Sequence, residues 1–361
     1  MRILHTESAC GWGGQIIRIL SEAKELNRLG HSVSILANPD SELLLRAKVD
    51  GLSVIPVNIE RKTPTACLRV WRILNDNRFD VVNTHSSTDS WLVAIARLFL
   101  RRKPAVVRTR HISTSIKNNP SSRWLYTRGC DFVVTTGEKL RDQLLNENGL
   151  SPHLVASVPT GSDPGKFNPE AKSNDEFTET IPQGTLVVGM IAKMRSWKGH
   201  KILIEALSKL SIPVHFLCVG GGPLSSEIID YATSLGVDST FVGELENVVP
   251  YLKAMDVFCL PSTSSEGVPQ AMTQAMLTGI PVIASDVGSV SEFIQDGETG
   301  LLVRPGAVAE LSRAIETYYS NTALVNVCKS NARSLALSKC SIETMGYRMV
   351  KVFEEVVTRA R

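Results

Sequence analysis

The sequence has 361 residues, of which 43% are hydrophobic and 21% are charged, and its formal net charge at pH 7 is +3. This length favours two domains, and this composition is typical of globular proteins that bury full cores. No stretch approaches about 18 consecutive apolar residues, which argues against a membrane-spanning helix. The N-terminal stretch MRILHTESACGWGG predicts a strand running into a glycine loop rather than a signal peptide.

Charge is divided unevenly between the two halves of the sequence. Residues 1–165 hold 22 Lys and Arg against 15 Asp and Glu, whereas residues 166–361 hold 17 against 21. The halves therefore carry net charges of +7 and −4. A basic first half of this kind favours contact with an anionic partner or membrane surface.

Cysteine usage bears on the compartment. The seven cysteines are scattered along the sequence without a CxxC pair or a pairing rhythm, which predicts reduced thiols. We therefore expect a cytoplasmic protein, peripheral on the inner face of the cytoplasmic membrane if the basic half meets lipid.

In the first half, short apolar runs alternate with helical patterns, which predicts a parallel sheet with helices on both faces. The predicted strands are 2–6, 32–37, 53–57, 80–84, 105–109, 131–135 and 155–158. The predicted helices include 15–29, 65–75, 90–100 and 139–146.

The second half repeats this plan after a polar stretch without periodicity, residues 168–184, which we interpret as an interdomain linker. Its predicted strands are 186–192, 214–219, 240–243, 257–260, 281–284 and 300–303. The expected organisation is an α/β protein with two Rossmann-like, doubly wound domains, 1–167 and 185–344. Residues 345–361 hold an apolar stripe at helical spacing and are expected to pack back on the first domain.

Three segments of the first half carry candidate polar residues. The glycine loop 11–15 joins the first strand to the first helix, and glycines there permit positive φ and close backbone approach. It is not a G-x-G-x-x-G motif, which disfavours a nicotinamide or flavin site, and a purely structural turn is the alternative. His85 and the pair Arg110-His111 each follow a predicted strand, at the edge where such sheets bind ligands.

Two of these assignments stay open on the sequence alone. His85 with Asp89 would form an oriented imidazole, and the alternative is a histidine that enters a helix or bonds within the core. The basic residues between Arg97 and Lys103 either stabilise the negative end of a helix dipole or form a patch that binds anionic lipid headgroups.

The second half opens with two cations, Lys193 and Lys198, around a predicted strand-to-helix loop. Two cations with a helix N-terminus would neutralise a diphosphate without a metal ion. The glycine turn 220–222 would let the backbone approach a ligand, and the segment 241–244 follows on the next strand.

The second half is organised around residues 261–292, which follow the predicted strand 257–260 and read as polar loop, helix and strand. Pro269 suits the first turn of the helix and Gly279 its end. Glu266 stands just before the helix, whose unpaired N–H groups and positive dipole end favour a phosphate.

This stretch resembles the donor-sugar site of the retaining glycosyltransferases of family 4. Their signature is a Glu, seven intervening residues and a second Glu. Here the first is Glu266 and the second is replaced by Gln274. The residues in register with the flanking pattern are Gly267, Pro269, Ala275, Met276, Gly279, Pro281, Val282, Ile283, Ala284 and Ser285.

The resemblance covers roughly residues 1–20 and 80–306 and implies the GT-B architecture, with the two domains facing across a cleft. It implies a metal-independent transfer of sugar from a nucleotide-diphospho-sugar to a glycan or glycolipid, with no separate cofactor. The implied catalytic residues are His111, Glu266 and Lys198. The implied donor-binding residues are Lys193, Lys198, Gly221, Gly243, Glu244, Glu266, Gly267, Val268, Pro269 and Gln274. The implied acceptor-side residues are Gly13, Gly14, Gln15, His85 and Arg110.

Several other chemistries lack support in the sequence. It holds no metal-ligand spacing, no D-x-D pair and no P-loop, and its cations lack the aromatic interleaving of a nucleic-acid binder. Two alternatives to a transferase remain: a UDP-N-acetylsugar 2-epimerase of the same architecture, and a nucleotide-sugar binder without catalysis. The segments HSSTDSW and RTRHIS lead us to expect a bacterial envelope acceptor such as lipopolysaccharide core.

Overall fold

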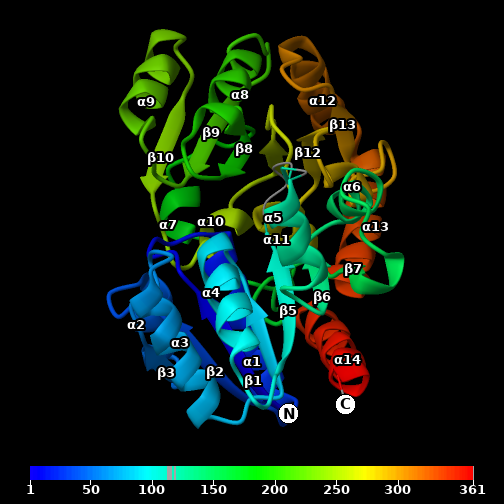
Figure 1. Ribbon diagram of the computed structural model, residues 1–361. Helices are drawn as coiled ribbons and strands as arrows, with labels where there is room; N and C mark the ends of the chain where they lie inside the picture. Colours follow the sequence, from blue (N-terminus) through cyan, green and yellow to red (C-terminus); the bar gives the residue numbers. More distant parts are fainter. Residues whose placement is uncertain (112–115, 118, 361) are drawn as a thin grey trace. The chain divides into compact units, whose positions relative to one another are not determined.

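The computed structural model describes residues 1–111, 116–117 and 119–360. It divides into two compact units, which are described separately (Figure 1). Unit 1 comprises Met1–Gly161 with Ile342–Arg361, and unit 2 comprises Ser162–Ser341.

Unit 1 is built on a seven-stranded sheet in which every pairing is parallel, with strand order β3-β2-β1-β4-β5-β6-β7. The strands are β1 Arg2–Glu7, β2 Ser32–Ala37, β3 Ser53–Pro56, β4 Val81–Thr84, β5 Ala105–Arg110, β6 Phe132–Thr135 and β7 Val155–Ser157. The helices are α1 Gly14–Arg28, α2 Glu42–Val49, α3 Pro64–Asp76, α4 Ser87–Leu98, α5 Pro120–Thr127, α6 Glu138–Asn146, η1 Pro152–Leu154 and α14 Ile342–Ala360.

Alternation along the strands of unit 1 creates two cores. Ile3 faces a core with α1, α2 and α14, whereas its neighbour Leu4 faces a core with α3, α4 and α5. Both faces of the sheet are therefore covered by helices.

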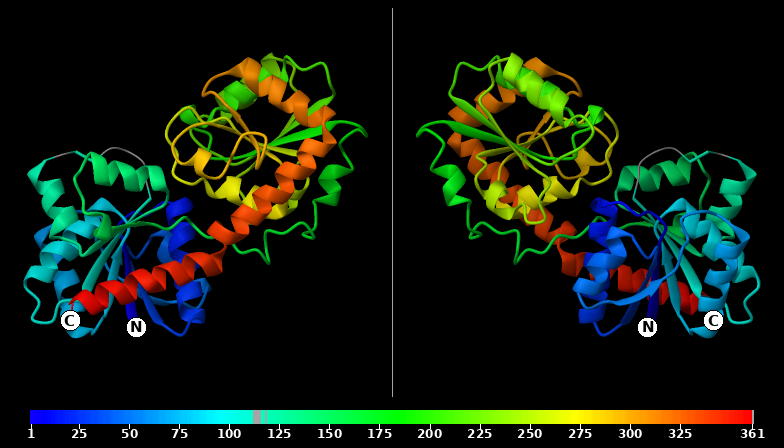
Figure 2. Two further views of the ribbon diagram at one scale, coloured as in Figure 1. Left: turned by 90° about the vertical axis from the view of Figure 1, so that its right-hand side faces the viewer. Right: turned by 90° about the vertical axis from the view of Figure 1, so that its left-hand side faces the viewer.

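The last helix packs against unit 1, as expected for residues 345–361, but it begins three residues earlier, at Ile342. Met345, Met349 and Phe353 are fully buried on its inner stripe, where it lies along α1 and β5 (Figure 2). Gly346 allows a close approach to α1, because a Cβ there would lie 2.4 Å from Cγ of Glu25.

Unit 2 repeats the plan with a six-stranded parallel sheet in the order β10-β9-β8-β11-β12-β13. The strands are β8 Leu186–Ile191, β9 Val214–Val219, β10 Ser239–Gly243, β11 Val257–Leu260, β12 Val282–Ser285 and β13 Leu301–Val303. The helices are α7 Asp175–Thr178, η2 Ser196–Lys198, α8 His200–Leu207, α9 Ser225–Ser234, α10 Val249–Lys253, α11 Gln270–Thr278, η3 Val290–Glu292, α12 Val308–Ser320 and α13 Thr322–Cys340.

The two Rossmann-like sheets confirm the predicted fold class. The predicted strands are all present, with no end shifted by more than one residue, whereas α2 and α5 were not among the predicted helices. Residues 168–184 were predicted to be a linker but belong to unit 2, because Phe177 of α7 is buried in its core. The boundary between the units lies earlier, at Gly161 and Ser162.

Each sheet has a topological switch point, where the strand order reverses on either side of the first strand. In unit 1 the switch lies between β1 and β4, and in unit 2 it lies between β8 and β11. Loops that leave the carboxyl ends of these neighbouring strands diverge to opposite faces, which leaves a crevice for a ligand. Of the candidate residues, Gly13–Gln15 and His85 follow β1 and β4, and Lys193, Lys198 and Glu266 follow β8 and β11.

Candidate functional site

In unit 2, the loops after β8 and β11 are held together by their backbones. Gly199 has φ +81°, and a Cβ on it would lie 1.9 Å from the carbonyl oxygen of Pro261. The amide of Thr263 donates to the carbonyl of Trp197 at 2.8 Å. Only glycine permits this approach at residue 199, and the approach sets Lys198 beside the second loop.

Lys198 and Glu266 form an ion pair across the switch point. The ammonium Nζ of Lys198 donates to Oε1 of Glu266 at 2.6 Å, and the hydroxyl of Ser262 donates to the same oxygen at 2.8 Å. The two charged side chains are only 20% and 13% exposed. Oε2 of Glu266 makes no hydrogen bond within the described part of the chain, so it remains available to a ligand.

The backbone of Glu266 is fixed by the loop after β12. The amide of Ser289 donates to the carbonyl oxygen of Glu266 at 3.0 Å. Gly288 has φ +55°, and a Cβ on it would lie 1.9 Å from that oxygen. Gly288 is thus a site residue that the sequence analysis did not identify, although it lies within residues 261–292.

Helix α11 begins four residues after Glu266. Its first residue is Gln270, preceded by Pro269, and no side chain of the described residues caps its N-terminus. The first N–H groups of such a helix suit an anion. Gln274 lies about one turn into the helix and is half-buried, so the residue that replaces the family's second Glu is accessible.

The second predicted cation lies at the edge of a glycine turn. Gly220 and Gly222 have positive φ, and a Cβ on Gly220 would lie 2.1 Å from the carbonyl oxygen of Ala192. Lys193 follows Ala192, and its Nζ lies 3.8 Å from Oε1 of Glu244 in a pair that is about half exposed. Two further donor-side residues lie beside this turn: the carbonyl oxygen of Gly221 accepts from the amide of Met194, and that of Gly243 accepts from the amide of Gly220.

In unit 1, three histidines from neighbouring strands form what we call the histidine row (His5, His85 and His111). Nδ1 of His5 lies 2.8 Å from Nε2 of His85, and Nδ1 of His85 lies 2.9 Å from Nε2 of His111. The rings are stacked in pairs. His85 and His111 were predicted as separate site residues, and the structure brings them together through a third.

The histidine row is electrically neutral. Burial lowers the pKa of His5 to about 3, and burial also holds the pKa values of His85 and His111 well below the usual 6.5. A neutral imidazole has one donor and one acceptor, so the two N···N bonds must run in the same direction. The tautomer of His111 is therefore tied to that of His5.

Beyond His5 lies a buried carboxyl group. Nε2 of His5 has no hydrogen-bond partner among the described residues and lies 3.9 Å from Oε1 of Glu22. The carboxylate of Glu22 accepts hydrogen bonds from Nε of Arg18 at 3.2 Å and from Nδ2 of Asn83 at 3.1 Å. Burial raises the pKa of Glu22.

Asp89 does not orient the ring of His85. Its carboxylate accepts from the backbone amides of His85 and Ser86, each at 2.9 Å, and from the hydroxyl of Thr6 at 2.8 Å. It therefore satisfies donors at the start of α4. The interpretation of His85 as a residue at a helix entry that bonds within the core is the one that fits.

The remaining acceptor-side residues line the same edge. Gln15 donates to Glu7 and, at 3.4 Å, to the carbonyl of His85. Burial and the charge of Asp89 raise the pKa of Glu7 to about 7. Arg110 is buried and donates to the hydroxyl of Tyr126 at 3.0 Å, so it braces α5.

The glycine loop does not use positive φ, contrary to the sequence-based rationale. Gly13 has φ 171°, an extended value that any residue adopts, and a Cβ on Gly11 or Gly13 would meet nothing within 4 Å. Gly14, which follows, is exposed. The absence of side chains here leaves open space at the edge rather than relieving a clash.

Sequence comparison identifies two families over most of the chain. The model for "Glycosyltransferase Family 4" matches residues 12–166, and the model for "Glycosyl transferases group 1" matches residues 171–335. In the structure, these two matches correspond closely to units 1 and 2.

Individual relatives are distant. A lipopolysaccharide core biosynthesis mannosyltransferase of Rhizobium leguminosarum bv. viciae is 28% identical over 58% of this chain and 60% of its own length. The match thus spans less than two thirds of that relative. A UDP-Gal:alpha-D-GlcNAc-diphosphoundecaprenol alpha-1,3-galactosyltransferase of Escherichia coli is 24% identical over 82% of this chain and 78% of its length.

Solved structures share the whole fold. A glycosyltransferase from Rickettsia africae ESF-5 aligns with TM-score 0.88 at 21% identity, covering 99% of this chain and 98% of that one. Alr3699/HepE of Anabaena, solved with UDP and glucose, aligns with TM-score 0.84 at 20% identity, covering 98% and 99%.

Proposed function

The chain belongs to the GT-B glycosyltransferases, and on that premise we propose that it moves a sugar from a nucleotide-diphospho-sugar to an acceptor hydroxyl, with retention of configuration and without a metal ion. The Anabaena structure similar to this chain was solved with UDP and glucose, which supports a donor of this class. The resemblance to the retaining enzymes of family 4 supports retention, since the leaving diphosphate and the incoming hydroxyl then share one face of the sugar.

The observation that carries the proposal is the ion pair of Lys198 and Glu266 at the start of α11. Cleaving the bond to the sugar adds negative charge to the diphosphate, and a fixed ammonium with helix N–H groups stabilises that charge. Glu266 holds Lys198 through Oε1 and offers Oε2 to sugar hydroxyls. Gln274, one turn along, is assigned to the ribose.

In unit 1, the histidine row supplies an oriented, uncharged imidazole. His111 is half-buried and is held through Nε2, so Nδ1 is left for a ligand. We assign His111 to the reacting side of the sugar, where a neutral imidazole holds a hydroxyl without adding charge.

For the acceptor, we propose a glycan or glycolipid of the bacterial envelope. The Rhizobium relative is named for lipopolysaccharide core and the Escherichia coli relative for a diphosphoundecaprenol-linked sugar. Of the segments that led to this expectation, HSSTDSW is described, whereas Ile112 and Ser113 of RTRHIS lie outside the described residues. The structure describes no helix long and apolar enough to cross a membrane, and we propose a cytoplasmic protein that meets the anionic membrane surface from inside.

The test is turnover of nucleotide-sugars after substitution of Lys198. Lys198→Ala should lower kcat by about 100-fold or more, because one charged donor to a developing anion contributes roughly 3 kcal/mol. Lys201→Ala is the matched control. The ammonium of this lysine, on α8, lies 2.5 Å from Oε1 of Glu227 on α9, so its partner is not a residue of the switch point. Equal activity of both variants would refute the assignment.

The same assay tests metal independence and the alternatives. Chelator should leave the wild type active, and full inhibition reversed by Mg²⁺ or Mn²⁺ would refute the metal-free mechanism. An epimerase would convert a free nucleotide-sugar without change of mass, and a binder would show affinity without turnover. The relatives above are named as transferases, which does not favour the epimerase.

A further inference from the structure

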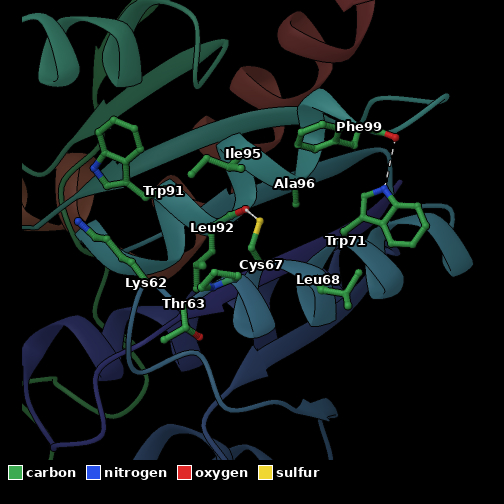
Figure 3. A pocket seen from close by; sticks show the side chains of 11 residues that line it. Lys62, Thr63, Cys67, Leu68, Trp71, Trp91, Leu92, Ile95, Ala96 and Phe99 are labelled. Atoms are coloured by element: carbon green, nitrogen blue, oxygen red, sulfur yellow. Dashed lines mark hydrogen bonds between the residues drawn. The ribbon is translucent and has the colours of Figure 1, made fainter.

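Unit 1 carries an apolar groove between α3 and α4, and the residues that line it all belong to this unit (Figure 3). Its volume is about 640 Å³, and its lining is almost entirely apolar. The side chains that form its walls are Leu68, Trp71, Trp91, Leu92, Ile95 and Phe99.

These walls stay exposed although they are apolar. Leu68 is 47% exposed, Ile95 is 38% exposed and Phe99 is 72% exposed. A contiguous apolar surface of this kind marks a binding site. The indole of Trp71 donates to the carbonyl of Phe99 at 3.3 Å, so the two aromatic residues at one end are tied together.

A cationic side chain lies at the other end of the groove. Nζ of Lys62 lies 3.4 Å from the hydroxyl of Ser87 and 5.7 Å from the ring centroid of Trp91. Burial and the charge of Arg108 lower the pKa of Lys62, and no Asp or Glu stands among the described residues that line the groove.

The cationic end is also the end nearest the candidate acceptor residues. Lys62 precedes α3, and Ser87 begins α4 directly after His85 and Ser86. From there the groove runs along the helices for about 12 Å, the rise of α4 between Trp91 and Phe99.

We propose that this groove holds the hydrocarbon chain of a lipid-linked acceptor, with the anionic linkage of that lipid at Lys62 and its sugar at the edge of His85 and His111. This assignment rests on the proposed glycosyl transfer and specifies its acceptor class. Charge favours an anionic, apolar occupant: Lys62 is the only charged residue in the described lining of the groove, and a neutral peptide would leave it without a counter-ion. At the far end, Phe99 adjoins the exposed residues 101–103, two arginines and a lysine, where the chain would emerge toward an anionic lipid surface.

The binding experiment uses n-alkyl phosphates as probes, below their critical micelle concentrations, with the full-length protein and calorimetric titration. Each methylene that enters the groove should tighten binding about fourfold between butyl, octyl and dodecyl phosphate. Neutral dodecyl maltoside should bind at least about tenfold more weakly than dodecyl phosphate. Affinity that does not rise with chain length would overturn the proposal.

Variants separate the apolar wall from the cation. Ile95→Glu should abolish binding of dodecyl phosphate, whereas Ile229→Glu on α9 of unit 2, at an equally exposed isoleucine, should not. Lys62→Gln should weaken dodecyl phosphate about tenfold and leave dodecyl maltoside unchanged. Equal effects of Ile95→Glu and Ile229→Glu would contradict a specific groove.

A readout on the wild type avoids dependence on variant folding. Cys67 lies on the groove, so dodecyl phosphate should protect it from alkylation, while exposed Cys10 reacts as before. If dodecyl phosphate left Cys67 unprotected and the protein bound only to anionic vesicles, the protein would bind a lipid surface and the groove would not hold a lipid chain. A dimer that Ile95→Glu dissociates would assign the groove to a second copy.

These outcomes are independent of turnover. Dodecyl phosphate should bind Lys198→Ala as it binds the wild type, because that lysine lies in unit 2. Loss of transferase activity with intact alkyl phosphate binding therefore bears on the proposed function alone, and the reverse result bears on the groove alone.

Discussion

Replacing His5 should flatten the pH dependence of folding stability. Its imidazole is fully buried, and its pKa falls to about 3 in the fold from about 6.5 when unfolded. Stability from the neutral ring is complete above pH 6.5 and is lost as the pH falls from 6.5 toward 3, because the unfolded chain then binds the proton. Between pH 7.5 and 5.5, proton uptake by this one residue should lower the free energy of unfolding of the wild type by about 1.4 kcal/mol.

The assay is urea unfolding of the wild type and His5→Asn at several pH values in this window. The Asn amide replaces Nδ1 of the ring and does not titrate. The free energy of unfolding of the variant should therefore be lower than that of the wild type by a constant packing cost, and between pH 7.5 and 5.5 it should fall by about 1.4 kcal/mol less than that of the wild type. Tryptophan fluorescence reports unit 1, which holds four of the five tryptophans: Trp12, Trp71, Trp91 and Trp124.

The control is His153→Asn, a change at an exposed histidine of the same unit. This side chain meets solvent in both folded and unfolded chains, so its loss should leave the pH dependence as in the wild type. An identical pH slope for His5→Asn and the wild type would mean that His5 takes up a proton as readily in the fold as in the unfolded chain, and the neutral histidine row would be refuted.

Two further predictions concern unit 2. Gln274→Glu should change the donor KM by less than about tenfold, because the wild-type amide already holds a ribose and the new charge would lie near a diphosphate. Glu266→Gln should instead lower kcat. Steady-state kinetics of both variants with the natural donor make the comparison. If Gln274→Glu created activity that the wild type lacks, the chain would be a binder that lost its chemistry. Gly288→Ala should destabilise unit 2 by several kcal/mol in urea unfolding, since its Cβ would lie 1.9 Å from the carbonyl oxygen of Glu266. Gly297→Ala shares the positive φ but meets nothing within 4 Å, so an equal loss there would show that φ alone matters.

The sequence predicted the parts of this protein that depend on local pattern. Buried parallel strands are continuous apolar runs, so all the strands could be placed, and with them the edges where Lys198, Glu266 and His111 lie. Helix α7 was missed because four residues carry no period, and a single buried side chain, Phe177, ties it to unit 2.

Contacts between distant segments could not be predicted in the same way. The resemblance identified Lys198 and Glu266, but their pairing joins residues 68 apart and depends on how closely Gly199 approaches Pro261. Likewise, His5 lies within a strand pattern, and nothing local distinguishes it from a core residue. Only the pairing of β1 with β4 brings it to His85.

The pairing of the cations changes the electrostatic account of donor binding. The sequence suggested two lysines facing a diphosphate, yet each already lies beside a carboxylate, Lys193 beside Glu244 and Lys198 beside Glu266. These four groups sum to zero charge, so an arriving diphosphate must displace a carboxylate or rely on the N–H groups of α11. The exposed pair at 3.8 Å is worth little and separates readily. The pair at 2.6 Å, mostly shielded from solvent, holds its geometry. Within the proposed mechanism, Lys193 therefore turns to the diphosphate, while Lys198 keeps Glu266 aimed at the sugar and shares its remaining charge with the leaving group.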